Sequence, residues 1–261
     1  MARQCNIQCR YCDRNVGERY HSFRPGVAGR IIRPGEVPKY IRAALRRCPD
    51  IEVVGVAGPG DPLANRETFE ALRVARLAFP RMKLCVCTNG LLLPEKVAEL
   101  AELGVEYLTI TINAATPRIA AKVYAQAGWH GAVLRGRRAG QVLIKNQFGG
   151  LERAVAAGMV VKVNSVLVPR LNDGELPLIA ERAASLGARI MNIMPLIPAG
   201  ELARHRAPEC GELQAARAAC EAALPQFRLC KQCRADACGV PGLGDFWFSN
   251  SGRNVKGDMV A

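Results

Sequence analysis

Short apolar runs alternate with amphipathic segments along most of the chain. The apolar runs are rich in β-branched residues and predict strands at 51–57, 83–88, 107–112, 160–167 and 190–195. Apolar residues at helical spacing predict helices at 37–47, 65–79, 94–103, 117–125, 142–157, 175–186 and 212–224. Strands and helices that alternate in this way form parallel βα units, so we expect an α/β fold.

The predicted strands are too few for the eight-stranded barrel that such units often build. We therefore expect an open sheet or a partial barrel, with a Gly-rich insertion at 128–140. The pattern changes after Pro198, where a helix and then a Cys-rich stretch follow. We divide the chain into a barrel core at 1–198, an extension at 199–239 and a flexible tail at 240–261.

Composition and charge narrow the class of protein further. No apolar run approaches the roughly 20 residues that cross a bilayer, and no secretory pattern opens the sequence, so we expect a cytoplasmic protein without a membrane partner. The net charge of +13 is spread along the chain, and its densest patch lacks interleaved aromatic residues for base stacking. We expect no nucleic-acid partner. A solvated Arg-rich surface explains the charge, and a positive cavity for anionic substrates is the alternative.

The chain holds 11 cysteines, and without a secretory signal clustered thiols indicate metal binding rather than disulfides. Cys5, Cys9 and Cys12 have a C-x3-C-x2-C spacing, with Tyr11 just before the last of them. Three thiolates can hold a [4Fe-4S] cubane and leave its fourth iron open, whereas a structural zinc ion usually takes four ligands. The spacing is typical of the radical S-adenosylmethionine (SAM) superfamily, in which the open iron binds the methionine part of SAM.

A second cysteine group lies near the end of the chain. Cys230 and Cys233 form a C-x2-C pair that needs a partner from elsewhere. Cys85 or Cys87 could supply it, since alternate residues of a strand point to the same side. Zinc held by the pair, by Cys238 and by one further ligand is the alternative.

Polar residues follow the predicted strands at the edge where parallel sheets bind ligands. Gly58 and Gly60 would let the backbone approach a ligand closely, and Asp61 is a candidate acceptor for the amino group of a bound cofactor. The candidates at or near the carboxyl ends of three later strands are Asn89, Thr111, Asn113 and Asn164.

Taken in order, these motifs resemble those of the NifB family, which matures the nitrogenase cofactor. The resemblance runs from about residue 3 to 239, and its most specific element is Cys-Arg-Ala-Asp-Ala at 233–237. The matching segments are 5–12, 24–27, 56–65, 88–91, 109–113, 162–167, 192–197 and 230–237.

The resemblance implies a partial (βα)6 TIM-like barrel of the radical SAM type and a lyase-type enzyme. Such an enzyme fuses [4Fe-4S] clusters into a carbide-containing eight-iron precursor, with one SAM as methyl donor and a second as source of the 5′-deoxyadenosyl radical. By the same resemblance, Cys5, Cys9 and Cys12 hold the radical cluster, and Cys85, Cys230 and Cys233 hold one of the other clusters. The positions that match the surroundings of SAM are Gly58, Thr111, Asn113 and Val166.

The sequence departs from the family at two places. Family members carry a few dozen residues before the cysteine that matches Cys5. Many also have a cysteine between the loop that matches 5–12 and the segment that matches 24–27. This chain starts four residues before Cys5, and 13–23 contains no cysteine. We therefore expect a truncated first strand and two bound clusters rather than three.

The resemblance also implies partners, namely iron–sulfur cluster donors, a scaffold or carrier protein of cofactor assembly, and an electron donor such as ferredoxin. Two other functions stay open. One is a radical SAM enzyme with another substrate, and the other is a non-catalytic iron–sulfur carrier.

Overall fold

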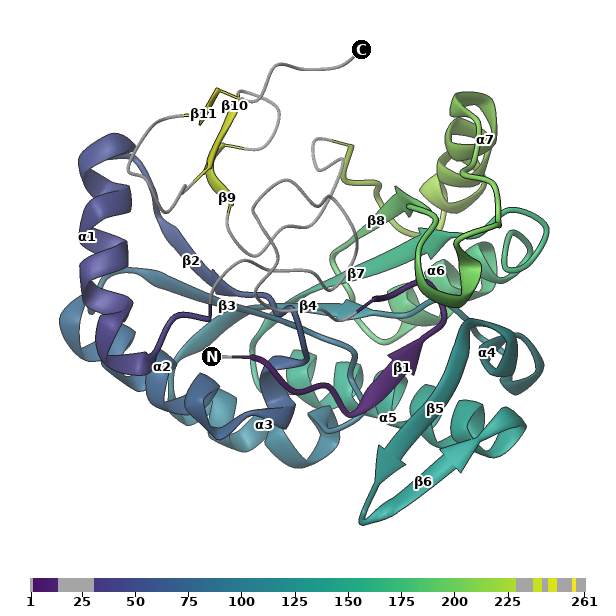
Figure 1. Cartoon of the computed structure of the whole chain (residues 1–261), viewed down its shortest axis with the longest axis horizontal. Helices are drawn as coiled ribbons and strands as arrows, with labels where there is room; N and C mark the ends of the chain where they lie inside the picture. Colours follow the sequence, from purple (N-terminus) through teal and green to yellow (C-terminus); the bar gives the residue numbers. More distant parts are fainter. Residues whose placement is uncertain (1, 14–30, 229–236, 241–243, 248–254, 257–261) are drawn as a thin grey trace.

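A five-stranded parallel sheet forms the centre of the protein (Figure 1). The computed structural model describes residues 2–13, 31–228, 237–240, 244–247 and 255–256. The strands of the sheet follow one another in sequence order: β2 (Val53–Val56), β3 (Lys83–Thr88), β4 (Val105–Thr111), β7 (Val160–Leu167) and β8 (Ile190–Pro195). All five strands predicted from the sequence are confirmed, and the open parallel sheet is that of a partial TIM-like barrel.

Seven helices in the described part of the chain precede, connect and follow these strands. They are α1 (Val37–Arg47), α2 (Arg66–Ala78), α3 (Leu93–Glu102), α4 (Pro117–Val123), α5 (Gly136–Ala156), α6 (Glu175–Ser185) and α7 (Cys210–Glu221). Of these, α3, α5, α6 and α7 contact the sheet directly. Short 3-10 turns lie at Pro34–Glu36, Pro62–Ala64 and Gly200–Leu202. The sheet residues on the helix side are almost fully buried, among them Val86, Ile110 and Val163, each 0% exposed.

The opposite face of the sheet is more polar, and we call it the inner face. In β3 the half-buried Cys85 and Cys87 alternate with the buried Leu84 and Val86, so the two cysteines share this face. Strand register aligns Cys87 with Thr109 of β4 and, one strand further, with Lys162 of β7. The predicted placement of Cys85 and Cys87 on one side of their strand is confirmed.

Three strands that the sequence did not predict form a second sheet, in the order β1-β5-β6. They are β1 (Ile7–Cys9), β5 (Tyr124–Trp129) and β6 (Ala132–Arg135), and β5 pairs antiparallel with both neighbours. The segment predicted as an insertion at 128–140 contains most of this hairpin and the start of α5, so the hairpin begins earlier and α5 begins earlier than the sequence predicted. His130 and Gly131 make the turn with positive φ angles of 47° and 78°, which a pattern of hydrophobic positions does not reveal.

A third small sheet, of order β11-β10-β9, lies near the end of the chain. It consists of β9 (Ala237–Val240), β10 (Gly244–Trp247) and β11 (Val255–Lys256), where the sequence predicted no strand. The preceding extension continues along the main sheet, because Met191 of β8 exchanges backbone hydrogen bonds with Pro225 and Phe227 at 2.8 and 2.7 Å. Of the helices in the described part of the chain, none is long and apolar enough to cross a membrane.

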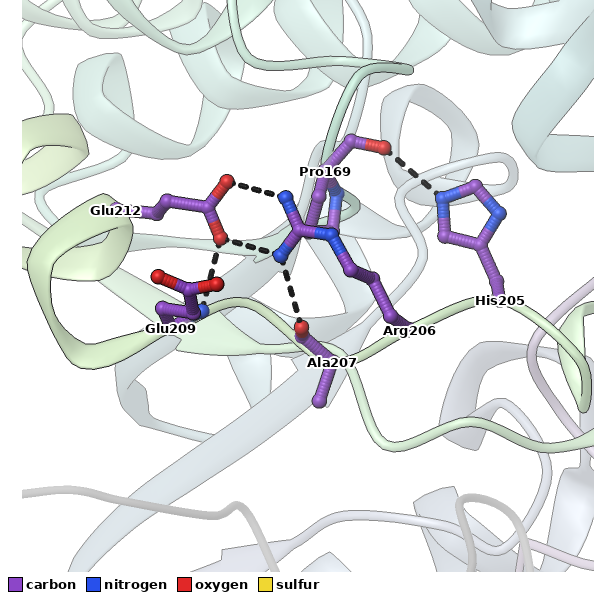
Figure 2. A network of polar contacts seen from close by, with 6 residues as sticks. All are labelled: Pro169, His205, Arg206, Ala207, Glu209 and Glu212. Carbon is purple, nitrogen blue, oxygen red and sulfur yellow. Dashed lines mark hydrogen bonds and ion pairs between the residues drawn. The ribbon is translucent and has the colours of Figure 1, made fainter.

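A polar network fixes the start of the extension (Figure 2). The Arg206 guanidinium donates two hydrogen bonds to the Glu212 carboxylate at 2.6 and 2.5 Å, and Glu209 donates its backbone N–H to the same carboxylate at 2.8 Å. The hydrogen bonds from Arg206 lower the pKa of Glu212 to about 2. His205 Nε2 lies 2.9 Å from the carbonyl oxygen of Pro169 in the loop after β7, so the extension is tied to the barrel.

Candidate radical-cluster site

The cysteine loop at 5–12 is tied to the barrel from both sides. On one side, β1 pairs with β5, and Arg10 donates its backbone N–H to Val123 at 2.9 Å. On the other, the loop after β2 receives the N-terminal segment, since Gly60 donates to Ala2 at 2.7 Å and Asp61 donates to Gln4 at 2.8 Å. The backbone therefore places the loop at the carboxyl edge of the main sheet, where ligands bind in parallel α/β folds.

The two glycines predicted to let the backbone approach a ligand act within the protein itself. A Cβ atom on Gly60 would lie 2.1 Å from the carbonyl oxygen of Gln4, so this glycine permits the close approach of the N-terminal segment. Gly58 has a φ of 63°, and a Cβ there would lie 2.4 Å from the Gly60 oxygen. Both residues shape the loop after β2, against which the N-terminal segment packs, and their contact with SAM stays a prediction.

Asn65 is a residue that sequence reasoning did not assign to the site. Its side-chain amide donates to the carbonyl oxygens of Gln4 and Asp61 at 2.8 and 2.7 Å, and it accepts the Gln4 N–H at 3.0 Å. The Asn65 side chain therefore makes both backbone hydrogen bonds of Gln4, as a neighbouring strand would. The only signal in the sequence was its position at the end of the matching segment 56–65.

Asp61 is 3% exposed, and its carboxylate accepts hydrogen bonds from three residues. The donors are the Leu63 N–H at 3.0 Å, the Thr88 hydroxyl at 2.9 Å and the Asn89 N–H at 2.6 Å. Burial raises the pKa of Asp61 to about 6, and these hydrogen bonds act in the opposite direction. In this structure the carboxylate joins the ends of β2 and β3, and its predicted contact with an amino group of SAM stays untested.

Asn89 brings the end of β3 to the first motif cysteine. Its amide nitrogen lies 3.8 Å from Cys5 Sγ and 2.7 Å from Asn6 Oδ1, while its oxygen accepts the Leu91 N–H at 2.9 Å. Hydrogen bonds to a thiolate favour its charged form and tune a bound cluster. Among the strand-end candidates, Asn89 therefore lies in direct contact with the cysteine loop.

Tyr11 links the cysteine loop to the ends of β4 and β7. Its hydroxyl accepts the Asn113 amide at 2.8 Å, and burial followed by the neighbouring Cys9 raises its pKa well above the usual value. Asn113 is 0% exposed, and its amide oxygen accepts the Val166 N–H at 2.8 Å. Asn172, which the sequence did not single out, donates to the carbonyl oxygens of Asn113 and Val166 at 3.0 and 2.8 Å. Asn113 and Val166 thus support the aromatic residue of the cysteine motif.

Thr111 ends β4, and in the sheet it lies level with Asn164 and Asn192 in the middle of β7 and β8. Asn192 donates to Asn164 Oδ1 at 3.4 Å, and both side chains are at most 2% exposed. The buried Asn192 Oδ1 has no hydrogen-bond partner among the described residues. Such an atom calls for a donor that the described protein does not supply, so this row fits a polar ligand. Asn192 itself was missed, although it opens the matching segment 192–197.

The second half of the cysteine loop packs against the start of the extension. Gly200, with a φ of 56°, donates its N–H to the Asp13 carboxylate at 2.8 Å. A Cβ on Gly200 would lie 2.7 Å from the Arg10 oxygen and 3.2 Å from the Cys12 nitrogen. Arg10 also forms an ion pair with Glu201. The loop is therefore enclosed by the barrel and the extension together.

The donor set of this loop fits a [4Fe-4S] cluster. Cys5, Cys9 and Cys12 are all half-buried, and the backbone around each of them is anchored. In the described part of the chain, no three His, Cys, Asp or Glu side chains converge as one metal ion would require. A cubane instead takes each thiolate on a different iron atom, so these three cysteines could hold three of its irons and leave the fourth for another ligand.

The second predicted cluster site is described only in part. Cys85 and Cys87 lie half-buried on the inner face of β3. Cys230 and Cys233 lie outside the described residues, as does the matching segment 24–27. Their assembly into one site therefore stays a prediction.

Comparison with known proteins defines the class. A family model described as the Radical SAM superfamily matches residues 1–183. The fold resembles Streptococcus suis SuiB with a TM-score of 0.59 and 11% identity, over 82% of this chain and 42% of that one. It also resembles a radical SAM methyltransferase from Sphaerobacter thermophilus with a TM-score of 0.58 and 19% identity, over 86% of this chain and 62% of that one. The matched family, the fold and the cysteine loop define a radical SAM protein.

More similar relatives narrow the class to one family. The FeMo cofactor biosynthesis protein NifB of Methanocaldococcus jannaschii is 40% identical over 240 residues, which cover 92% of this chain and 80% of that protein. The protein of the same name from Azotobacter vinelandii is 43% identical over 249 residues, or 93% of this chain and 49% of that protein. The chain therefore belongs to the NifB family.

Proposed function

We propose that this protein is a radical SAM enzyme of nitrogenase cofactor assembly. Its substrates are [4Fe-4S] clusters, which it fuses into the carbide-containing eight-iron precursor. One SAM supplies a methyl group and a second supplies the 5′-deoxyadenosyl radical, as expected for a lyase-type enzyme. The cluster held by Cys5, Cys9 and Cys12, when bound, supplies the electron that cleaves SAM.

The contact between Asn89 and Cys5 supports this proposal most directly. It joins the cysteine loop to the end of β3, so a cluster held by the loop would lie near the carboxyl edge of the sheet. The buried amide pair of Asn164 and Asn192 lies level with Thr111 at the end of β4, and we assign it to holding the polar part of SAM. Thr111 lies half-buried beside this pair.

The inner face offers a place for the substrate clusters. We propose that Cys85, together with Cys230 and Cys233, holds one of them. The clusters are anionic when bound to thiolates, and Lys162 aligns with Cys87 two strands away in the same row. The Lys162 ammonium lies 5.3 Å from the centre of the Phe227 ring, so in this structure it lies on the β8 side of β7. A positive group at this place would hold an anionic substrate on the inner face.

The proposed partners follow from the same chemistry. The protein would receive clusters from iron–sulfur cluster donors and pass its product to a scaffold or carrier protein of cofactor assembly. It would also need an electron donor such as ferredoxin. Because reduced clusters and thiolates need a reducing compartment, we propose that the protein works in the cytoplasm.

Reductive cleavage of SAM tests the radical assignment. Protein reconstituted anaerobically with iron and sulfide is incubated with dithionite and SAM, and 5′-deoxyadenosine is measured by chromatography. We expect 5′-deoxyadenosine from the unaltered protein and none from the Cys12→Ala variant. Cys48→Ala, which removes a half-buried thiol outside the site, is the matched control. Absence of 5′-deoxyadenosine from the unaltered protein would leave only the non-catalytic carrier.

Iron counting tests the number of clusters. Two cubanes correspond to about eight iron atoms per chain, and three to about twelve. We expect the lower number after anaerobic reconstitution, because 13–23 contains no cysteine. The higher number would contradict the expectation of two clusters and would leave the radical assignment unchanged.

A further inference from the structure

A continuous stretch of the chain carries basic residues and no acidic ones. Residues 107–151 contain no Asp or Glu, and the stretch is bounded by Glu106 and Glu152. The basic side chains within it are all exposed, and they lie on α4, at the end of β6 and on the first half of α5. We call them the basic surface: Arg118, Lys122, Arg135, Arg137, Arg138 and Lys145.

The charges of the basic surface are not neutralised within the described part of the protein. No described carboxylate forms an ion pair with any of its six side chains. Arg135 donates to the neutral Gln126 amide at 2.9 Å. The nearby Glu95 of α3 lies 2.7 Å from His130 at the tip of the hairpin. The surface therefore presents a positive field to the solvent.

An apolar patch lies at the edge of the basic surface. Val133 of β6 is 56% exposed, and Leu134 beside it is half-buried. In the described residues β6 pairs only with β5, so its outer edge is open, and the hairpin projects from the side of the barrel (Figure 1). An exposed apolar side chain and an open strand edge beside positive charge are features that a protein partner can contact.

The basic surface is directly connected to the cysteine loop. Arg135 of β6 pairs with Gln126 of β5, and Gln126 pairs with Gln8 of β1, which precedes Cys9. Three strands therefore form one continuous row from the basic surface to the cluster ligands. At about 4.8 Å between neighbouring strands, the backbones of Arg135 and Gln8 lie about 10 Å apart.

We propose that the basic surface is the docking site of an acidic electron-carrier protein of the ferredoxin type. This inference rests on the proposed function, in which each cleavage of SAM needs one electron. The reduced carrier loses one electron, and the cluster held by Cys5, Cys9 and Cys12 gains it. Complementary charge would bring an acidic carrier to the hairpin and orient it beside the cysteine loop.

The position of the surface favours this partner over a nucleic acid. A nucleic acid would also bind positive charge, but its binding would not need a connection to the cysteine loop. An electron carrier does need one, because its electron has to reach the cluster. The open apolar edge of β6 also favours a protein partner.

The test compares two sources of electrons in the reconstituted holoenzyme. The variant Arg135→Glu, Arg137→Glu, Arg138→Glu reverses the centre of the basic surface. The rate of 5′-deoxyadenosine formation is measured with a reduced acidic ferredoxin and, separately, with dithionite. We expect the ferredoxin-driven rate to fall about tenfold or more and the dithionite-driven rate to stay unchanged.

The matched control reverses the same number of exposed arginines elsewhere. Arg46→Glu, Arg73→Glu, Arg81→Glu changes α1, α2 and the loop after α2, which lie on the other side of the barrel (Figure 1). Because its net charge equals that of the test variant, it separates the effect of the basic surface from the effect of the overall charge of the protein. We expect it to keep most of the ferredoxin-driven rate. An equal fall in both triple variants would overturn the proposal.

Further outcomes separate this proposal from the proposed function. If the unaltered protein forms no 5′-deoxyadenosine even with dithionite, the proposed function fails, and docking is then judged by the Kd of the oxidised ferredoxin. A Kd that the triple variant leaves unchanged refutes the docking site. If the triple variant loses both the ferredoxin-driven and the dithionite-driven rate, the double variant Lys122→Glu, Lys145→Glu is tested in its place. An unchanged ferredoxin-driven rate in the double variant refutes the docking site. Tighter binding of a single-stranded oligonucleotide than of ferredoxin also overturns it.

Discussion

The buried carboxylate of Asp61 makes the stability of this fold depend on pH in an unusual direction. A raised pKa means that the folded state binds the proton more tightly than the unfolded state. The contribution of Asp61 to stability is therefore fully present below pH 3.8 and is lost as the pH rises through about 6. Most surface carboxylates that form ion pairs act in the opposite direction.

The size of this effect follows from the shift. The pKa of Asp61 rises from 3.8 to about 6, and each pKa unit corresponds to about 1.4 kcal/mol. Integrated over pH, the ionised side chain costs about 1.6 kcal/mol at pH 5 and about 3 kcal/mol at pH 7. No reduction for solvent screening is needed, because Asp61 is 3% exposed.

The perturbation is Asp61→Asn, which removes the charge and keeps the shape. Its amide places one NH2 group against the N–H donors of Leu63 or Asn89, which costs about 1–3 kcal/mol at every pH. The pH-dependent cost disappears, however. Relative to the unaltered protein, the variant should therefore gain about 1.3 kcal/mol between pH 5 and pH 7.

Urea denaturation of the cluster-free protein under anaerobic, reducing conditions measures this change. Both proteins are unfolded at pH 5, 6 and 7, and the difference in free energy of unfolding is plotted against pH. Asp50→Asn, which removes a charge at an exposed position, is the matched control. A difference for Asp61→Asn that is equal at pH 5 and pH 7 would refute the burial argument.

Two further predictions concern the loop after β2 and the extension. Gly60→Ala should destabilise the fold by about 1–3 kcal/mol and lower iron incorporation, because its Cβ would lie 2.1 Å from backbone of the N-terminal segment. Gly149→Ala, where nothing lies within 4 Å, should instead stabilise α5 by about 0.5–1 kcal/mol, and urea denaturation of both variants checks the contrast. Glu212→Gln should lower Tm more at pH 6 than at pH 3. Because the pKa of Glu212 is lowered from 4.5 to about 2, its pair with Arg206 stabilises the fold fully above pH 4.5, and this stabilisation is lost as the pH falls through 2. An equal decrease of Tm at pH 6 and pH 3 would contradict this reasoning.

Much of the barrel could be predicted from the sequence because its signals are local. The strands at 83–88, 160–167 and 190–195 agree in both bounds, since their alternation with helices leaves few other ways to bury the apolar runs. The first strand is shorter than predicted. It is an edge strand with Val53 43% exposed, and burial there does not extend to its predicted ends.

The sequence predicts which residues of the site could bind a cluster, but it does not predict most of the contacts that hold these residues in place. The spacing of the cysteines identified the class, because it depends only on neighbouring residues. The pairing of β1 with β5 joins Ile7 to Ala127 across most of the barrel core, and no local pattern reveals such a contact. The roles of Asn65 and Asn172 were missed for the same reason, since their partners are set by how the loops pack.

Transfer of the SAM methyl carbon into a metal cluster tests the central proposal most directly. Reconstituted protein is incubated with methyl-labelled SAM, dithionite and sulfide, and label is counted in the iron cluster that is extracted after removal of small molecules. The account predicts label in the cluster, dependent on Cys5, Cys9 and Cys12, together with 5′-deoxyadenosine. Formation of 5′-deoxyadenosine with no label in the cluster would contradict it and indicate a radical SAM enzyme with another substrate.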